Sequence, residues 1–421
     1  MKKIIPLVVV TSCIAFAQTA YAATKKEVLN HYSDIALATY GDSLLTAKKL
    51  QQSLVSLTQK PTQQTLSDAK KAWISARAPY QQTEVYRFGN TIVDDWEGKV
   101  NAWPLDEGLI DYVASSYGAE SDDNPLYTAN VIANTSLILS GKTIDTSNIT
   151  KTLLQDTLHE IDGVEANVAT GYHAIEFLLW GQDLNGTNAG AGNRPASDFD
   201  TNNCSWGNCE RRAQYLLTAG ALLIDDLTWM VSQWQPNGEA RLSLLADEDA
   251  GIRSILVGMG SLSYGELAGE RIKLGVLLHD PEEEHDCFSD NTHNSHYYDI
   301  LGIQNIYLGR YTTVSGDTLT GASLSHLVVA QNTETDKVLK QKITASLQAA
   351  KVVVDSAEID KVAYDQLIAE GNTGGNAKVM GIVDALLEQT KAIENAVAAL
   401  DVSLVEFEGS DSLDSPNTVF Q

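Results

Sequence analysis

A histidine and a glutamate stand three residues apart in the otherwise apolar segment GYHAIEFLLWGQDL, residues 171–184. At about 100° per residue, a helix over this segment places His173 and Glu176 on one face, together with Phe177 and Trp180. The opposite face is aliphatic, so the helix has no solvated side and must be surrounded by protein. Burying two polar groups is costly unless they meet a partner. A single helical turn can offer an imidazole nitrogen and a carboxylate to one cation, and the spacing indicates this chemistry.

A purely structural explanation of the pair remains open. A histidine hydrogen-bonded to a buried carboxylate in the core would need no metal, and two ligands do not make a site. Gly171, at the start of the segment, has no side chain and therefore allows another backbone or a ligand to come close.

Other candidate binding residues lie on other segments. Glu84 and Arg87 share one helix face with Arg77, Tyr80 and Phe88. Taken alone, such an acid–base pair is more often a stabilising pair than a site.

Two polar segments also contain residue types capable of such chemistry. The segment DDWEGKVNAWPLDEGLIDY, residues 94–112, is rich in tryptophan and acids, and long loops of this kind are often functional. The segment HDPEEEHDCFSDNTHNSHYYD, residues 279–299, holds half of the histidines of the chain. These are His279, His285, His293 and His296. Exposed clusters of this composition bind divalent metals adventitiously, and the order of residues is not that of an EF-hand loop.

The sequence lacks the common signatures of hydrolytic and nucleotide-binding sites. It contains no His-Glu-x-x-His helix, no phosphate-cradling glycine loop, no dinucleotide-binding fingerprint and no nucleophile elbow. Metal-assisted hydrolysis needs a general base and an activated water. If Glu176 were that base, too few metal ligands would remain nearby.

The first residues predict an exported protein. A basic start at Lys2 and Lys3, an apolar run and the small-residue ending AYA are typical of a signal peptide over residues 1–22. A lipoprotein cleavage site before Cys13 is the alternative, although the apolar run continues past it. No later stretch has the roughly 18 uncharged apolar residues of a membrane helix. We therefore expect a periplasmic mature chain with no membrane span.

The chain is strongly acidic. Its formal net charge is −26, and it becomes −28 without Lys2 and Lys3, the only charged residues before Ala23. Such a surface repels nucleic acid and anionic lipid and favours cationic partners. We therefore expect no nucleic-acid partner, whereas the charge alone is only a weak indication of metal.

Three cysteines follow the predicted signal peptide. Cys204 and Cys209, in CSWGNC, enclose a tight loop and are expected to form a disulfide in an oxidising compartment. Zinc binding is the lesser alternative, because no second Cys/His pair lies at finger spacing. Cys287 is expected to be a buried thiol.

Helical periodicity dominates the chain and predicts an all-α fold. Apolar residues recur at three- and four-residue steps in residues 26–59, 62–89, 149–181, 211–234, 252–278, 336–357 and 377–402. With about four long helices in each half, two helical bundles side by side are the economical architecture. Each bundle would carry one long polar insertion, at residues 90–125 and 280–335.

The predicted organisation after the signal peptide has four parts. They are an N-terminal bundle carrying the histidine and glutamate (23–184), a linker or loop rich in Gly, Asn and Asp (185–210), a C-terminal bundle (211–408) and an irregular tail (409–421). Both halves place a tyrosine a few residues ahead of a glutamate and an arginine, so an old duplication is an open alternative.

Several blocks of the sequence resemble the imelysin family, particularly its iron-regulated protein A branch. GYHAIEFLLWGQDL is similar to the Gly-x-His-x-x-Glu signature of that family, and PYQQTEVYRFGN, VNAWPLDEGLIDY, HDCFSDNTH and GIQNIYLGRY are similar to other blocks. The resemblance implies two helical domains with the signature near the cleft between them. It also implies an exported envelope protein associated with iron. By the match, Gly171, His173 and Glu176 are the signature residues. The family is catalogued among the peptidases, yet the motif does not supply a complete hydrolytic centre.

Our leading hypothesis is a protein of iron acquisition with a binding site in the interdomain cleft. The ligand would be a divalent or ferric metal ion, with iron as the first choice, or a small iron-bearing or peptide ligand. His173 and Glu176 would be direct metal ligands. Further candidates for the wall of the site are Gly171, Glu84, Arg87, Asp106, Asp183, Asp290 and His293. Envelope proteins of iron uptake are the expected protein partners.

Two other hypotheses come from different functional classes. The first is a metallopeptidase that uses the same pair. The second is an envelope interaction protein in which His173 and Glu176 are core structure alone. The sequence does not decide whether the protein is an enzyme.

Overall fold

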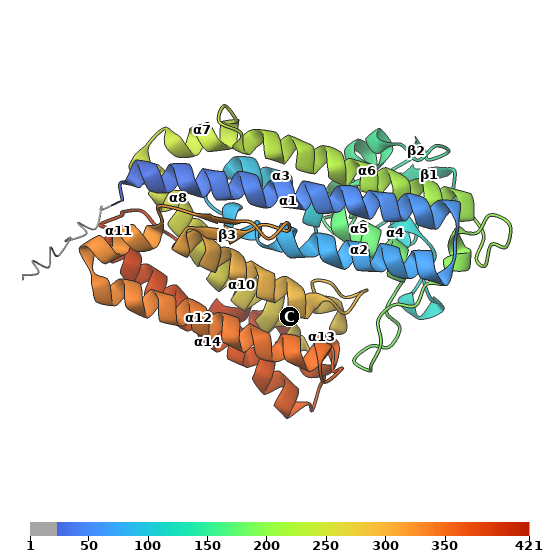
Figure 1. Ribbon diagram of the computed structural model, residues 1–421. Coiled ribbons are helices and arrows are strands. Elements are labelled where there is room, and N and C mark those ends of the chain that lie inside the picture. The colour runs from blue at the N-terminus through green and yellow to red at the C-terminus, as the bar shows by residue number, and fades with distance from the viewer. Residues whose placement is uncertain (1–22, 421) are drawn as a thin grey trace, which may run out of the picture.

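The chain folds into long α-helices with two short β-hairpins (Figure 1). The computed structural model describes residues 23–420. The predicted signal peptide, residues 1–22, and the alternative lipoprotein residue Cys13 lie outside the described residues. Over the residues described, the predicted all-α fold is confirmed.

The helices and strands occur in the following order. The first half contains α1 (Lys25–Gln59), α2 (Gln63–Gln81), α3 (Thr91–Asn101), α4 (Glu107–Ile110), the hairpin strands β1 (Ser136–Leu139) and β2 (Lys142–Asp145), and α5 (Gly171–Trp180). The second half contains α6 (Cys209–Trp234), α7 (Glu239–Leu245), α8 (Glu248–Ser261), α9 (Leu274–Leu278), α10 (Thr292–Leu308), β3 (Arg310–Thr312), β4 (Thr318–Thr320), α11 (Leu324–Gln331), α12 (Thr333–Glu358), α13 (Tyr364–Ile368), α14 (Thr373–Ala399) and α15 (Asp411–Asp414). Short 3₁₀ or π-helical segments are η1 (Glu84–Tyr86), η2 (Ser115–Tyr117), η3 (Leu153–Leu158), η4 (Ile161–Gly163), η5 (Ala196–Phe199), η6 (Leu262–Lys273), η7 (Pro281–Glu283) and η8 (Thr418–Phe420).

Local sequence signals define where the first two helices begin. Thr24 caps α1, because its hydroxyl accepts from the Glu27 amide at 3.2 Å while the Glu27 carboxylate accepts from the Thr24 amide at 2.8 Å. Thr62 and Thr65 form the corresponding capping box of α2. These reciprocal bonds satisfy amides that have no partner inside a helix. The α2 helix ends two residues after Pro79.

Two groups of helices lie one above the other in Figure 1. In the upper group α1 packs along α2 and α6, and in the lower group α12 packs along α14 and α10. Contacts of α10 with α2 and of α8 with α1 join the groups, and one hydrophobic cluster runs through both. The site described below lies where α2, α5 and the segment before α10 meet.

The packing of α6 does not follow the predicted boundary between the bundles. Residues 211–408 were expected to form the second bundle, yet α6 lies along α1 in the first group. A connection over residues 185–210 therefore leads back into the first group of helices. The division into two domains stays a prediction.

Both predicted polar insertions are partly helical, which corrects the expectation of long loops there. Residues 90–125 contain α3 and α4, and residues 280–335 contain α10, α11 and the β3–β4 hairpin. The buried positions of α10 include His293, His296 and Asp299. Because polar residues occupy its buried face, apolar periodicity does not reveal this helix.

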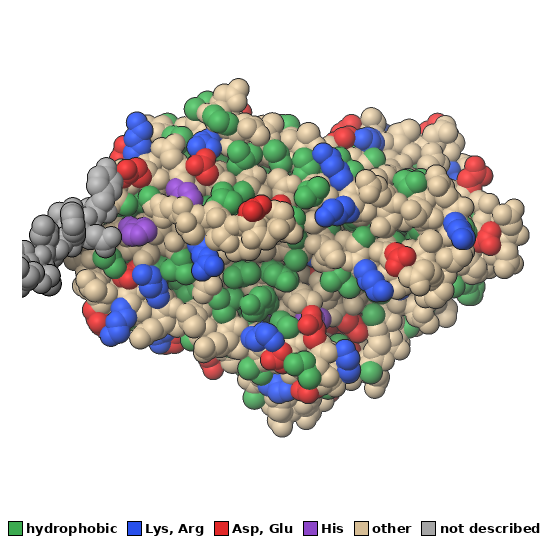
Figure 2. Space-filling view, in the orientation of Figure 1, with side chains coloured by type: hydrophobic (Ala, Val, Ile, Leu, Met, Phe, Trp, Pro, Cys, Tyr) green, Lys and Arg blue, Asp and Glu red, His purple; other side chains and the backbone are tan. Residues whose placement is uncertain are grey.

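The surface of the described chain carries charges of both signs. On the face shown in Figure 2, acidic and basic side chains are interspersed, so no single patch gathers the net negative charge there. None of the described helices combines the length and apolar character needed to cross a membrane.

The predicted partners Cys204 and Cys209 are joined by a disulfide, with their Cα atoms 5.9 Å apart. Cys209 is the first residue of α6, so the bond ties the preceding loop to the start of that helix. Cys287 is a free, partly buried thiol.

Candidate metal centre

The α5 helix places the His/Glu pair inside the protein. All ten of its residues are buried, and it contacts α2, α3 and α6. This agrees with the rule that a helix without a polar face is surrounded by protein. At its first residue, Gly171 has φ +81°, and a Cβ atom there would lie 2.4 Å from the Val100 carbonyl oxygen. The close approach expected at Gly171 is therefore that of the Val100 backbone.

His173 and Glu176 are hydrogen-bonded to each other. His173 Nδ1 lies 3.0 Å from Glu176 Oε2, and Glu176 Oε1 accepts a hydrogen bond of 3.0 Å from the Ser289 amide. The side chains are 1% and 0% exposed. The other ring nitrogen, His173 Nε2, is buried and has no hydrogen-bond partner. One imidazole nitrogen is thus held by a carboxylate while the second is left with no partner.

The segment before α10 brings two more possible ligands to His173. The His285 ring lies 4.8 Å from the His173 ring between centroids, and Asp286 Oδ1 lies 4.0 Å from His173 Nδ1. Each of the three residues offers one donor atom, and these atoms all lie within 4.8 Å of one another. Among the described residues this is the one group of three or more such side chains that meets this distance. We call His173, His285 and Asp286 the histidine centre.

Arg77 of α2 balances the charge of Asp286. Its Nη2 lies 2.7 Å from Asp286 Oδ1 and 3.3 Å from His285 Nδ1, and its Nη1 donates to Asn101 Oδ1 at 2.6 Å. The guanidinium of Arg77 is 1% exposed. Asn291 also donates to Asp286 Oδ2 at 2.8 Å. These donors fix the orientation of the Asp286 carboxylate.

Both histidines of the centre are held in the neutral form. Burial, followed by the positive charge of Arg77, lowers the pKa of His173 to about 3. Burial and the Arg271 guanidinium lower the pKa of His285 well below its usual value. A neutral imidazole is the form that binds a metal ion.

The two carboxyl groups differ. Burial and the nearby charge of Asp286 raise the pKa of Glu176 well above its usual range. Burial alone would raise the pKa of Asp286 too, but the Arg77 guanidinium, the neighbouring His173 and hydrogen bonds from Ser295 and Asn291 together outweigh burial and lower it. Asp286 is therefore the ionised carboxylate of the centre, and Glu176 is held mainly by hydrogen bonds.

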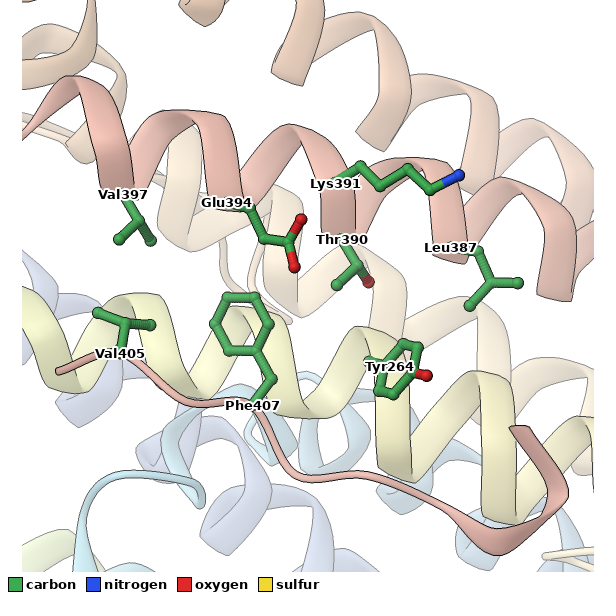
Figure 3. Close-up of a pocket in the computed structure, with 8 residues that line it drawn as sticks. All are labelled: Tyr264, Leu387, Thr390, Lys391, Glu394, Val397, Val405 and Phe407. Atoms are coloured by element: carbon green, nitrogen blue, oxygen red, sulfur yellow. The ribbon is translucent and has the colours of Figure 1, made fainter. Parts of the chain in front are cut away.

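The His/Glu pair does not face an open cleft, which corrects that expectation. The segment before α10 covers it, because His285 packs on His173 and the Phe288 ring lies 5.4 Å from that of Phe177. A cavity of about 720 Å³ lies elsewhere, between α14 and the segment that carries Phe407 (Figure 3), and neither His173 nor Glu176 lines it. Only an ion or a very small molecule fits a centre this enclosed.

Two of the predicted binding residues lie in a neighbouring ion-pair network. Glu84 is 2.7 Å from Arg271, which also contacts Glu266 at 2.6 Å and Asp299 at 3.4 Å. Arg87 pairs with Glu266 at 3.2 Å. The charge of Arg271 lowers the pKa of both His173 and His285. No residue of this network is among the three ligands of the histidine centre.

The remaining predicted residues lie at other places. Asp106 precedes α4 and accepts from Asn124. Asp183 follows α5 and accepts from the Asn185 amide at 2.9 Å. Asp290 has a buried, unpartnered oxygen, and His293 lies 3.9 Å from Glu358. None of these four is among the three ligands of the histidine centre.

Three residues of the site were not among the candidates drawn from the sequence: Arg77, His285 and Asp286. Arg77 had been placed on a helix face with Glu84 and Arg87, and His285 in a histidine-rich segment. The available signal for the last two was their adjacency in the block HDCFSDNTH, where a histidine and an aspartate can present two ligands from one loop.

Comparisons with known proteins agree on one family and one fold. A family model described as imelysin matches residues 36–393. The curated iron-regulated protein A of Synechococcus elongatus is 27% identical over 116 residues, which are 28% of this chain and 33% of that protein. The match thus spans about a third of the curated relative.

Two solved structures are similar to the chain. A protein from Parabacteroides distasonis assigned as an iron-regulated protein A precursor has a TM-score of 0.64 at 16% identity, over 91% of this chain and 97% of that chain. An imelysin-like protein from Psychrobacter arcticum has a TM-score of 0.56 at 14% identity, with the same coverage. At these identities the likeness concerns the fold.

Proposed function

Because the chain belongs to the imelysin family, whose model spans most of its length, we propose that it is an iron-related protein that binds one metal ion at the histidine centre. His173, His285 and Asp286 are the proposed ligands. Iron is the proposed metal, since the curated relative bears the name iron-regulated protein A.

One observation carries the proposal. Two neutral imidazoles and one ionised carboxylate, all buried, present donor atoms within 4.8 Å of one another, and His173 Nε2 has no hydrogen-bond partner. Buried polar atoms normally find a hydrogen bond, so an unpartnered nitrogen in such a group is best explained by a ligand. Two histidines and one carboxylate suit ferrous iron, and zinc is the main competitor.

Glu176 is proposed to position His173 rather than to bind the metal. It accepts from His173 Nδ1 and is itself held by the Ser289 amide. A carboxylate behind a ligating histidine selects the tautomer that leaves Nε2 free and makes that nitrogen more basic. The His-x-x-Glu spacing would therefore supply one metal ligand, His173, and one residue that orients it, Glu176.

Replacing Glu176 by glutamine is expected to weaken Fe(II) binding by about 10- to 100-fold without abolishing it. The amide oxygen can still accept from His173 Nδ1, but it cannot become the negative carboxylate that a bound cation nearby would favour at Glu176. Anaerobic titration of the purified protein with Fe(II), followed by calorimetry, measures the change. Glu97→Gln is the matched control, because Glu97 is a buried carboxylate bonded to Asn101 and not to the centre. An unchanged Kd in the Glu176 variant would remove Glu176 from the metal site.

A metallopeptidase remains the competing function, and enclosure of the site argues against it. A polypeptide substrate would have to reach side chains that are at most 1% exposed. Incubation with an unfolded polypeptide, with and without chelator, separates the two functions. We expect no chelator-sensitive cleavage, and cleavage that Glu176→Gln abolishes would replace the binding function by a catalytic one.

The proposed location is the periplasm, with envelope proteins of iron uptake as partners. The leader-like residues 1–22 and the Cys204–Cys209 disulfide support export, because disulfides persist in oxidising compartments. Fractionation of cells that make the full chain would test this location.

A further inference from the structure

A small acidic cavity lies beside the histidine centre but is built from other residues. Three segments form it: the turn after α5, the segment from η7 to Phe288, and the start of α13. It is lined by Asp183, Pro281, Glu282, Glu284, Cys287, Phe288 and Asp365. Its volume is about 10 Å³, close to what one water-sized particle needs. None of the lining residues is basic.

Two carboxylates in this cavity are buried, and no hydrogen bond of normal geometry reaches their oxygens. Glu284 and Asp365 are each 1% exposed. Neither oxygen of either group has a hydrogen bond of normal geometry. The Thr292 hydroxyl lies near the Glu284 carboxylate, and the backbone amides of Gln366 and of Asp365 itself lie near the Asp365 carboxylate. Burying an unpaired carboxylate is costly, so these groups need a proton or a cation.

The neighbouring acids repel one another. Glu284 lies close enough to Asp365 and Asp290 for their charges to act on it. Burial and nearby acids raise the pKa of Glu282 and of Asp290 to about 7, and that of Asp365 to about 6. Bringing a positive charge into the cavity would relieve this repulsion.

We propose that this cavity is a second cation site, which binds Ca²⁺ through the carboxylates of Asp183, Glu282, Glu284 and Asp365. The site is independent of the histidine centre, and none of its proposed ligands is a ligand there. Its cation is held by oxygen alone.

The ligand chemistry favours Ca²⁺ over the metals of the histidine centre. Hard cations prefer carboxylate oxygens, whereas imidazole suits iron, copper and zinc. Cys287 is the one sulfur among the lining residues, and a hard cation prefers the carboxylate oxygens to it. Mg²⁺ demands a strict octahedral arrangement, while Ca²⁺ accepts irregular sets of six to eight oxygens.

The carboxylates are spread more widely than the ligands of the histidine centre. Among the described residues, only the histidine centre brings three donor atoms within 4.8 Å of one another. Like charges keep the acids of the cavity apart, and Ca²⁺ would draw them together. Glu284 and Glu282 lie on a segment outside the long helices, where side chains and backbone can make this adjustment.

The test is a Ca²⁺ titration of the full chain after removal of bound metal with chelator. We expect one Ca²⁺ per chain by calorimetry and a rise in Tm that MgCl₂ at the same concentration does not produce. In Glu284→Gln we expect at least tenfold weaker Ca²⁺ binding and loss of the Ca²⁺-induced rise in Tm. The Tm of this variant without Ca²⁺ should equal or exceed that of the unsubstituted protein, because an unpaired buried carboxyl group is replaced by a neutral amide.

Two control variants separate this site from its surroundings. Cys287→Ala should keep the Ca²⁺ response, since the thiol is not a ligand. His173→Ala should also keep it, since the histidine centre is separate, so failure of the proposed iron site would leave the Ca²⁺ result intact. If Glu284→Gln does not fold, Asp365→Asn makes the same test.

Three results would overturn the proposal. One is the absence of binding at about 10 mM CaCl₂, roughly tenfold above the Kd of the weakest class of protein calcium sites. Another is an unchanged Ca²⁺ response in folded Glu284→Gln and Asp365→Asn. The third is loss of the response in His173→Ala, which would assign the bound Ca²⁺ to the histidine centre.

Discussion

Replacing Arg77 by glutamine is expected to lower the free energy of unfolding by about 3–5 kcal/mol, because it leaves the buried Asp286 carboxylate without its charged partner. Both side chains are at most 1% exposed, and their nearest atoms are 2.7 Å apart. Arg77 also donates to Asn101 and lies over the ring of Tyr172. Urea denaturation of the metal-free protein measures the loss.

Two further variants show whether the loss comes from the ion pair. Arg77→Gln combined with Asp286→Asn should recover part of the stability, because removing both charges leaves no unpaired ion. Lys342→Gln breaks the exposed pair with Glu388 and should change the stability much less. An Arg77→Gln protein as stable as the unsubstituted chain would mean that the pair does not form.

Replacing His285 by alanine is expected to weaken Fe(II) binding by on the order of 100-fold or more. Loss of an outer-shell partner alone costs about 10- to 100-fold, and loss of a direct ligand exceeds this. His285 lies in the group of three donor residues although it is far from His173 in the sequence. Anaerobic titration with Fe(II) measures the affinity.

His293→Ala is the matched control for this prediction. His293 is also a buried histidine, at the start of α10, but it lies 3.9 Å from Glu358 and is outside the histidine centre. Its removal should leave the Fe(II) affinity within about twofold. Equal losses in the two variants would show that His285 acts through the general stability of this segment.

Periodicity and composition predicted most of the long helices and the burial of the His/Glu pair. The α5 segment is apolar on every side, and such a helix can only lie inside the protein. The three-residue spacing then placed His173 and Glu176 on one turn, and the structure joins them by a hydrogen bond of 3.0 Å. Both inferences depend only on the regular geometry of one helix, so the order of residues is enough to make them.

The partners of the pair could not be derived in the same way. His285 and Asp286 lie on a segment without helical periodicity, whose path depends on contacts such as that of Ser289 with Glu176. The helix that follows, α10, buries His296 and Asp299, so its pattern resembles that of a polar loop. The ligand set is therefore a consequence of tertiary packing.

Asp183 and Asp290 show a second feature that the sequence alone could not reveal. They were proposed as further candidates to complete the wall of one site. The structure instead places Asp183 in the acidic cavity and Asp290 near it, where the charges of Asp365 and Asp183 act on Asp290. Residue type indicated cation chemistry, but only the fold separates these acids from the histidine centre.

The most direct test of the central claim is the metal content of protein purified without an affinity tag, loaded anaerobically with Fe(II) and freed of unbound metal by desalting. The account predicts close to stoichiometric iron in the unsubstituted protein and almost none in His173→Ala, provided urea denaturation shows that the variant is folded. Equal iron in the two proteins would contradict a metal centre at His173.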